Sequence, residues 1–449
     1  MARILFNPLI HLLLAANGAL AGLTVDVEDA ASIKSAAALV AEDLMTFYPG
    51  NNPGEPVGIF TPPPEGKYYW WTGSILWNAL LDYRNHTGET KYDEDISESL
   101  LFQRGPNDNY LPLNWSATIA NDDVASWALA AAEAEGIGFQ EPGQTNPNWL
   151  TLAKNVFYNL RDGDRRVDDC EGALRWQIYP YNNGYNYIAA SANIFYFNLA
   201  AQLAHLTGDQ TYEDAADGAY KILENLGFIN SKYDVYDGAQ VSDCTAVNKA
   251  QFSSNAAMLL QGVAFMYSHT NGNDDWKARV DGLVSRTLEV FFPDGIAFEA
   301  SCEKGDKCNT DMIFYKSMLH RALGSTIQLA PYTSANILPV LKSSAKGAVA
   351  QCTGGDNGRL CGFSWASGKF DGTTGPAQQM GVLSALASIL PTEGAVAGNS
   401  STNSTSTGSG SSSGSSQDST SSNTPASTGT HTAVTLGGMA LMVLGSLLI

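Results

Sequence analysis

The chain has 449 residues, of which 44% are hydrophobic, and its 45 acidic and 25 basic side chains give a formal net charge of −20 at pH 7. This charge argues against nucleic acids and anionic membrane surfaces as partners, because both would repel the protein. It suits a neutral or cationic substrate, or solubility in an acidic extracellular space.

The chain begins with a segment typical of a secretory signal. One positive charge, Arg3, precedes an apolar run over residues 9–14, and Ala-Leu-Ala follows at 19–21. The run is too short and too interrupted to span a membrane. We therefore predict that residues 1–21 are a cleaved signal peptide and that a single folded domain follows at 25–395.

Two kinds of apolar segment alternate through that domain. One set is strongly apolar and rich in small residues, at 70–86, 121–133, 191–205, 253–269, 312–329 and 376–390. The other set is amphipathic, at 30–47, 94–103, 149–159, 211–226, 274–291 and 335–349. Helices that are apolar on all sides pack inside, and helices with one polar face pack outside. We therefore predict an all-α (α/α)6 barrel, with a compact solenoid of helical hairpins as the alternative.

Two adjacent carboxylates, Asp122 and Asp123, begin the second apolar helix. In such a barrel the starts of the inner helices lie on one face, where a reactive group is expected. One Asp would suffice to cap the helix, which is the structural alternative. A second Asp adds like-charge repulsion that raises one pKa. Glycoside hydrolysis needs this asymmetry, and carboxyls about 5 Å apart would imply retention of configuration.

Aromatic side chains gather before two of the apolar helices. Residues 68–71 read Tyr-Tyr-Trp-Trp, and residues 176–187 combine five aromatic rings with several Asn side chains. Flat rings beside amides suit sugars, although any single ring more often packs in a core. The residues predicted to bind substrate are Trp70, Trp71, Asn121, Trp176, Asn186, Tyr187 and Gln251.

Six cysteines in a secreted chain indicate three disulfides. Cys302 with Cys308 and Cys352 with Cys361 are close enough to staple two loops, which leaves Cys170 with Cys244, although spacing alone does not prove this pairing. There is no Cys-x-x-Cys pair and no acidic run with alternating ligand spacing, so we predict neither metal nor cofactor. Sequons predict N-glycosylation at Asn85, Asn114, Asn399 and Asn403.

The C-terminal part has a different composition. Residues 399–432 are dominated by Ser, Thr, Gly and Asn, so we predict a Ser/Thr-rich stalk at 396–423. Residues 433–449 are almost wholly apolar, with no Lys or Arg after them. This pattern predicts a GPI signal at 424–449 that is removed on attachment at Asn423, or at Ser422. We expect a monomer anchored to the plasma membrane or the cell wall.

The motif Asn121-Asp122-Asp123 before an Ala-rich helix resembles the Asp-Asp motif of glycoside hydrolase family 76, the endo-α-1,6-mannanases. The resemblance spans nearly all of residues 25–392, and the signal, stalk and GPI tail point to its fungal cell-wall branch. Further stretches that carry it are 69–73, 169–177, 185–187 and 375–379.

The resemblance implies an (α/α)6 fold and retaining chemistry on α-1,6-mannosidic bonds, with Asp122 as nucleophile and Asp123 as general acid/base. It also implies cleavage of the mannose core of GPI anchors and transfer of the glycan to wall β-glucan. Hydrolysis and transfer use the same catalytic residues. The main alternative is a glycan-binding wall protein without turnover. An enzyme for unsaturated uronides is disfavoured, because an acidic sugar needs basic partners.

Overall fold

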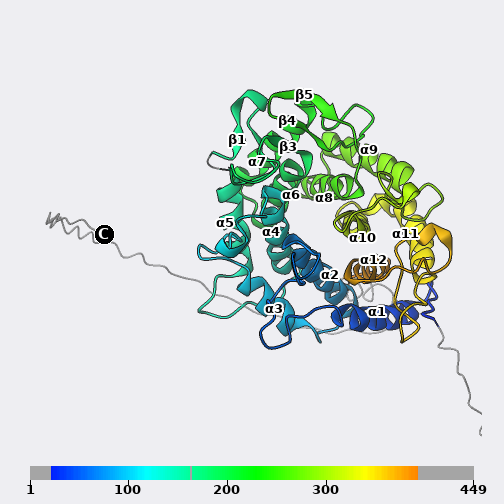
Figure 1. Ribbon diagram of the computed structural model, residues 1–449. Coiled ribbons are helices and arrows are strands. Elements are labelled where there is room, and N and C mark those ends of the chain that lie inside the picture. The colour runs from blue at the N-terminus through cyan, green and yellow to red at the C-terminus, as the bar shows by residue number, and fades with distance from the viewer. Residues whose placement is uncertain (1–21, 162–163, 393–449) are drawn as a thin grey trace, which may run out of the picture. The chain divides into compact units, whose positions relative to one another are not determined.

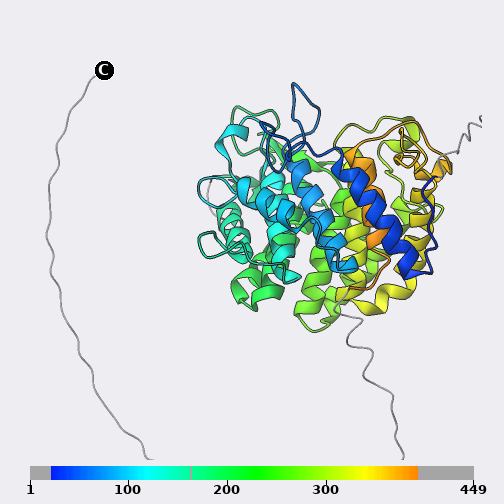
Figure 2. The same cartoon turned by 90° about the horizontal axis from the view of Figure 1, so that it is seen from below.

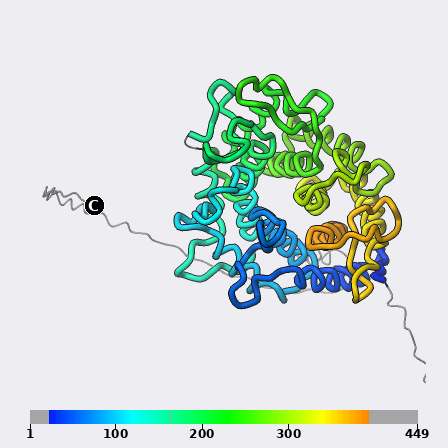
Figure 3. The backbone as a smooth tube through the Cα atoms, viewed as in Figure 1, coloured from blue at the N-terminus to red at the C-terminus, as the bar shows by residue number. Residues whose placement is uncertain are grey.

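The structure is a computed structural model that describes residues 22–161 and 164–392, and in this part of the chain twelve α-helices form two concentric rings (Figure 1). The inner ring contains α2 (Trp71–Thr87), α4 (Asn121–Gly136), α6 (Ala190–Thr207), α8 (Ser253–His269), α10 (Tyr315–Leu329) and α12 (Pro376–Ala387). The outer ring contains α1 (Ala30–Met45), α3 (Asp93–Phe102), α5 (Trp149–Arg161), α7 (Gln210–Asn225), α9 (Asp274–Phe291) and α11 (Ser334–Val349). The (α/α)6 barrel is confirmed, and the backbone trace shows the chain passing alternately between the rings (Figure 3).

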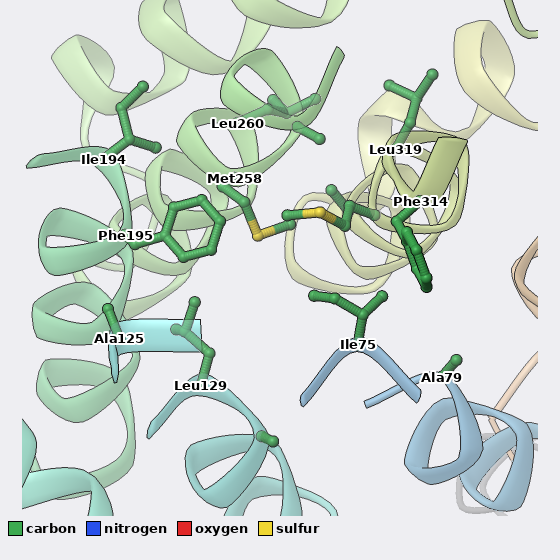
Figure 4. Close-up of a cluster of buried hydrophobic side chains, with 14 of the residues drawn as sticks. Ile75, Ala79, Ala125, Leu129, Ile194, Phe195, Met258, Leu260, Phe314 and Leu319 are labelled. Atoms are coloured by element: carbon green, nitrogen blue, oxygen red, sulfur yellow. The ribbon is translucent and has the colours of Figure 1, made fainter. Parts of the chain in front are cut away.

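The two rings differ in how they bury their side chains, as their sequences predict. Inner helix α6 buries residues on every side, including the polar Asn198. Outer helix α7 buries one face only, through Tyr212, Ala216 and Leu223 among others, and leaves the opposite face to solvent. Apolar inner faces therefore meet around the barrel axis. Figure 4 shows Ile75, Leu129, Phe195 and Met258 from four inner helices converging there.

Two of the predicted hairpins end their first helix in the same way. Gly88 after α2 and Gly208 after α6 adopt left-handed conformations, with φ of 76° and 69°. Only glycine adopts this conformation without strain, and it lets the chain leave the helix and turn back. Asp209 then caps α7 by accepting a hydrogen bond from the backbone N–H of Thr211. The helices run side by side along the barrel axis (Figure 2).

Short strands and single 3-10 turns occupy the connections. The strands are β1 (Arg166–Val167), β2 (Ala173–Leu174), β3 (Tyr187–Ala189), β4 (Gly238–Gln240) and β5 (Asp243–Asn248). Strand β1 pairs with β2, and β3-β4-β5 form a second antiparallel sheet in which Ile188 faces Ala239. The 3-10 turns are η1 (Leu113–Trp115), η2 (Asp168–Cys170), η3 (Glu303–Gly305), η4 (Met312–Phe314), η5 (Pro331–Thr333) and η6 (Trp365–Ser367).

A polar cluster joins three inner helices inside the barrel. Arg321 of α10 donates to Asp82 of α2 at 2.5 Å and to Asn78 at 3.1 Å. Glu133 of α4 lies beside Asp82, and its pKa is raised to about 8, chiefly by burial and then by the charge of Asp82. At neutral pH Glu133 therefore favours its protonated form, in which it can donate a hydrogen bond to Asp82.

All three predicted disulfides are present, joining Cys170 to Cys244, Cys302 to Cys308 and Cys352 to Cys361. Of the predicted glycosylation sites, Asn114 is exposed and Asn85 is half-buried on α2, while Asn399 and Asn403 lie outside the described residues. The predicted signal peptide, stalk and GPI signal lie outside them as well and stay predictions. In the described part, no helix is both long and apolar enough to cross a membrane.

Candidate active site

A cavity of about 780 Å³ opens on the face of the barrel where the inner helices begin. Its walls come from the first turns of five inner helices and from the loops that precede them. The lining residues on or beside the inner helices are Trp71, Asp122, Asp123, Ser126, Ser191, Phe195, Phe252, Ser254, Asn255, Asn309, Asp311, Tyr315 and Met318. Trp176, Pro180 and residues 182–187, together with residues 189, 237 and 240, complete the wall. The cavity therefore lies on the face that the barrel topology predicts.

Asp122 and Asp123 lie in the first turn of α4 and both line the cavity. Asp123 accepts the backbone N–H of Ala120 at 2.8 Å through Oδ2, so it does contribute to capping the helix. Asp122 also accepts a first-turn N–H, because its Oδ1 accepts the N–H of Asp123 at 3.1 Å, while its Oδ2 accepts the hydroxyl of Ser191 at 2.5 Å. Capping therefore uses one oxygen of each carboxyl group, and it does not account for the contact of Asp122 with Ser191 or for the position of both groups on the cavity wall.

The two carboxylates have raised but different proton affinities. The surrounding protein desolvates Asp122 and raises its pKa to about 6, against the lowering effect of hydrogen bonds from Ser191 and Trp176. The pKa of Asp123 is raised well above its ordinary value, first by desolvation and then by the charge of Asp122. Asp122 is therefore the member of the pair that ionises first, and Asp123 is the member that keeps its proton. This is the charge state that a glycosidase pair requires.

Two further carboxylates line the cavity. Asp311 accepts a hydrogen bond from the indole N–H of Trp71 at 3.2 Å. Asp237 accepts from the hydroxyl of Tyr187 at 2.6 Å and from Asn248 at 2.8 Å. No Lys, Arg or His stands among the described residues of the wall. The cavity thus presents four carboxylates without a cation, which favours a neutral or cationic ligand over an acidic one.

Four predicted substrate-binding residues reach this cavity: Trp71, Trp176, Asn186 and Tyr187. Trp176 is 37% exposed, and its backbone N–H bonds to the carbonyl of Tyr187 at 2.8 Å. Gly184, with φ of 92°, packs against the Trp176 ring so closely that a Cβ there would lie 2.3 Å from it. The ring is therefore held in place on the cavity wall, where its indole N–H donates to Asp122.

Three of the residues predicted to bind substrate, Trp70, Asn121 and Gln251, do not line this cavity. Trp70 is buried, stacks on Trp127 with ring centroids 5.1 Å apart, and donates to Gln103 at 2.7 Å. It packs in the core because neighbouring positions of a helix point about 100° apart, so only Trp71 faces the cavity.

Asn121 is also buried and does not line the cavity. Its amide donates to the carbonyl of Arg175 at 2.9 Å, and its oxygen accepts from Arg165 at 3.1 Å. It thus ties the start of α4 to the loop that carries Trp176. Gln251 is half-buried just before α8 and is not part of the cavity wall either.

Sequence reasoning missed Ser191, Asp237 and Asp311. Asp311 directly precedes the predicted helix 312–329, so the rule that selected Asp122 and Asp123 could have found it. Ser191 starts an inner helix too, but a lone Ser carries little signal. Asp237 reaches the cavity through the pairing of β3 with β4, which have three residues each, too few for a visible alternation.

Residues 32–401 match the sequence model of the family described as glycosyl hydrolase family 76. The chain belongs to glycoside hydrolase family 76. Among family 76 relatives, it is 38% identical over 371 residues to a putative mannan endo-1,6-alpha-mannosidase of Schizosaccharomyces pombe, covering 82% of this chain and 83% of the relative. It is also 38% identical over 368 residues to the mannan endo-1,6-alpha-mannosidase DCW1 of Saccharomyces cerevisiae, covering 81% and 80%.

Solved family 76 structures agree with this fold. The crystal structure of Dfg5 from Chaetomium thermophilum in complex with glucosamine is 41% identical, with a TM-score of 0.79, covering 81% of this chain and 91% of that one. An inactive variant of an α-1,6-mannanase from Salegentibacter, in complex with α-1,6-mannotriose, has a TM-score of 0.63. It covers 80% of this chain and 98% of its own, and at 14% identity it supports the fold alone.

Proposed function

We propose that this protein is a retaining glycosidase and transglycosidase that acts on α-1,6-mannosidic linkages. The observation that carries the proposal is the pair Asp122 and Asp123 on one cavity wall, with Asp123 holding a proton more tightly than Asp122. Family membership adds to it, because relatives at 38% identity are named mannan endo-1,6-alpha-mannosidases.

In the first step, the carboxylate of Asp122 attacks the anomeric carbon of the mannosyl unit in the cavity. The bond from that carbon to the leaving oxygen breaks, and Asp123 gives its proton to this oxygen. The product is a glycosyl ester on Asp122. Ser191 holds the oxygen Oδ2 of Asp122 and thereby fixes the orientation of the carboxylate. Desolvation of Asp122 also makes the carboxylate a stronger nucleophile than it would be in water.

In the second step, the ionised Asp123 removes a proton from an incoming hydroxyl group, whose oxygen attacks the anomeric carbon and releases Asp122. When that hydroxyl belongs to water the outcome is hydrolysis, and when it belongs to a sugar the outcome is transfer. Two inversions give net retention. We propose that β-glucan of the wall is an acceptor, so that the enzyme joins glycans as well as cutting them.

The proposed donor is the mannose-containing core of a GPI anchor. The cavity suits this donor because its described wall carries four acidic side chains and no basic one, so that a neutral mannose or a cationic amino sugar fits its charge. The related Dfg5 has been solved with glucosamine bound. The predicted signal peptide and GPI signal would place the enzyme at the cell surface, where such donors and wall glucan meet.

The second candidate function is a mannan-binding wall protein that retained the barrel and lost turnover. The exposed Trp176 and the Asn side chains of 182–186 would serve binding equally well. The protonation asymmetry of Asp122 and Asp123 favours the enzyme, because binding alone has no need of a desolvated carboxylate pair.

The two functions separate in one assay of the secreted protein. It is incubated with α-1,6-mannooligosaccharides or a GPI-core glycan, with and without a β-glucan acceptor. Products shortened by whole mannose units support the glycosidase, and a glucan-linked product supports transfer. Saturable binding without turnover under any acceptor condition would support the binding protein instead.

A further inference from the structure

Asp311 is held firmly just before the N-terminal end of α10. The side chain of Asn309 accepts the backbone N–H of Asp311 at 3.0 Å and that of Met312 at 3.0 Å, which starts the turn η4. The disulfide between Cys302 and Cys308 closes the loop immediately before this turn. The position of the Asp311 carboxylate is therefore fixed before any ligand arrives.

The Asp311 carboxylate uses only one of its oxygens within the protein. Oδ1 accepts the indole N–H of Trp71 at 3.2 Å, and Oδ2 has no partner among the described residues. Both Asp311 and Trp71 line the cavity, and burial raises the pKa of Asp311 above its ordinary value. Asp311 is half-buried, so water can reach this oxygen in the cavity and a bound ligand can replace that water. A hydroxyl group of a bound sugar would then donate to Oδ2.

The charge of Asp311 also acts on the catalytic pair. Asp311 raises the pKa of Asp123 in addition to the effects of desolvation and of Asp122, while the N–H of Ala120 lowers it. For the pKa of Asp122, desolvation and hydrogen bonds are the largest effects, and Asp311 contributes less. The other ionisable side chains that line the cavity are Asp237, Tyr185, Tyr187 and Tyr315. Asp311 therefore affects Asp123 more than Asp122.

We propose that Asp311 is a further functional residue of the reaction proposed above: its free oxygen binds a hydroxyl of the sugar, and its negative charge acts in the cavity that also contains Asp123. This inference rests on the proposed function. It gives Asp311 two measurable roles, one in substrate affinity and one in the pH range of activity. Trp71 supports both roles by orienting the carboxylate.

The test is the pH profile of kcat/KM for Asp311→Asn acting on α-1,6-mannotetraose. Asparagine keeps the shape and can still accept the Trp71 hydrogen bond, but it carries no charge. The pKa of Asp123 should then fall, so the basic limb of the profile should move to lower pH by about half a unit or more. The acid limb, set by Asp122, should move less than the basic limb. KM should rise about tenfold with the loss of a charged hydrogen-bond acceptor.

Two variants complete the experiment. Asp311→Glu keeps the charge and should keep the basic limb, and Asp294→Asn, an exposed carboxylate outside the cavity, should behave as wild type. A basic limb that does not move in Asp311→Asn, or an equal loss of activity at every pH, would overturn the inference while leaving the glycosidase in place.

A binding measurement tests the role of Asp311 independently of the proposed glycosidase activity. The affinity for mannotetraose is compared by calorimetry between Asp122→Asn and the double variant with Asp311→Asn. A loss of about tenfold in affinity supports the role of Asp311 in binding, even if the wild type shows no turnover. Equal affinities overturn that role.

Discussion

Ser191, the second residue of α6, donates a hydrogen bond of 2.5 Å to Oδ2 of Asp122 in the first turn of α4. The two helices are neighbours in the inner ring, so the barrel itself fixes the direction of the carboxylate. The bond also lowers the pKa of Asp122, opposing the larger effect of desolvation. Ser191 thus keeps the proposed nucleophile ionised at a lower pH than its enclosure alone would allow.

Replacing Ser191 by Ala should therefore shift activity toward higher pH. Without the hydroxyl, the pKa of Asp122 rises above about 6, and because the nucleophile must be ionised, the acid limb of kcat/KM moves to higher pH. We expect kcat below that limb to fall about tenfold. Ser191→Thr retains the hydroxyl and should restore the profile. An unchanged acid limb in the Ala variant would show that the hydrogen bond does not act on Asp122.

Replacement by Phe should mainly lower stability at Trp70 and mainly raise KM at Trp71. Trp70→Phe removes buried ring area and the bond to Gln103, so we expect about 2–3 kcal/mol less stability in denaturant unfolding, with little change in KM. Trp71→Phe loses its bond to Asp311 in the cavity, so KM should rise several-fold while the unfolding midpoint hardly moves. A larger KM effect for Trp70 than for Trp71 would contradict the assignment of the two rings.

The cluster around Glu133 predicts a pH-dependent contribution to stability. The folded pKa of Glu133, about 8, lies above its unfolded value, so the folded state keeps a proton that the unfolded state loses. Its stabilising contribution is complete below pH ~4.5 and is lost as the pH rises to about 8.

Glu133→Gln cannot ionise and should gain stability relative to wild type as the pH rises from 5 to 8, which thermal unfolding of both proteins measures. Glu135→Gln serves as the control, because Glu135 is half-exposed and lies two residues further along α4. A difference in Tm between wild type and Glu133→Gln that stays constant over this pH range would show that Glu133 is not protonated in the folded state.

The three disulfides should contribute unequally to stability. A crosslink restricts the unfolded chain more when its loop is longer, and Cys170–Cys244 spans 74 positions against six for Cys302–Cys308. Replacing the first pair by Ala should cost about 4 kcal/mol and the second about 2 kcal/mol. The second replacement should nevertheless raise KM more, because it loosens the loop that carries Asp311. Denaturant unfolding and steady-state kinetics on both double variants check this order.

The alternation of helices was readable from the sequence because inner and outer helices bury different fractions of their surface. Helices α4, α8 and α12 begin at the predicted residues 121, 253 and 376. The predicted helix at 312 begins instead with the turn η4, and α10 starts at Tyr315. The backbone N–H groups of this first turn bond to Asn309 rather than following an α-helical pattern, and apolar periodicity does not report such capping.

The site was predictable only in part. Asp122 and Asp123 stand out because two carboxylates exceed what capping requires. The sequence does not show that Trp70 packs in the core and Trp71 lines the cavity, because this depends on how α2 is rotated about its own axis. Asp237 lies far along the chain from the catalytic pair, and only the pairing of β3 and β4 brings it to the cavity.

The most direct test of the proposed chemistry follows the anomeric configuration of the first product by NMR, using α-1,6-mannotetraose and the wild-type protein. Retention predicts that the α-anomer appears first. Asp122→Asn and Asp123→Asn should each lose at least about 1,000-fold in kcat/KM, whereas Asp169→Asn, from an exposed acidic pair outside the cavity, should keep full activity. Initial release of the β-anomer, or turnover that survives in either Asp122→Asn or Asp123→Asn, would contradict the account.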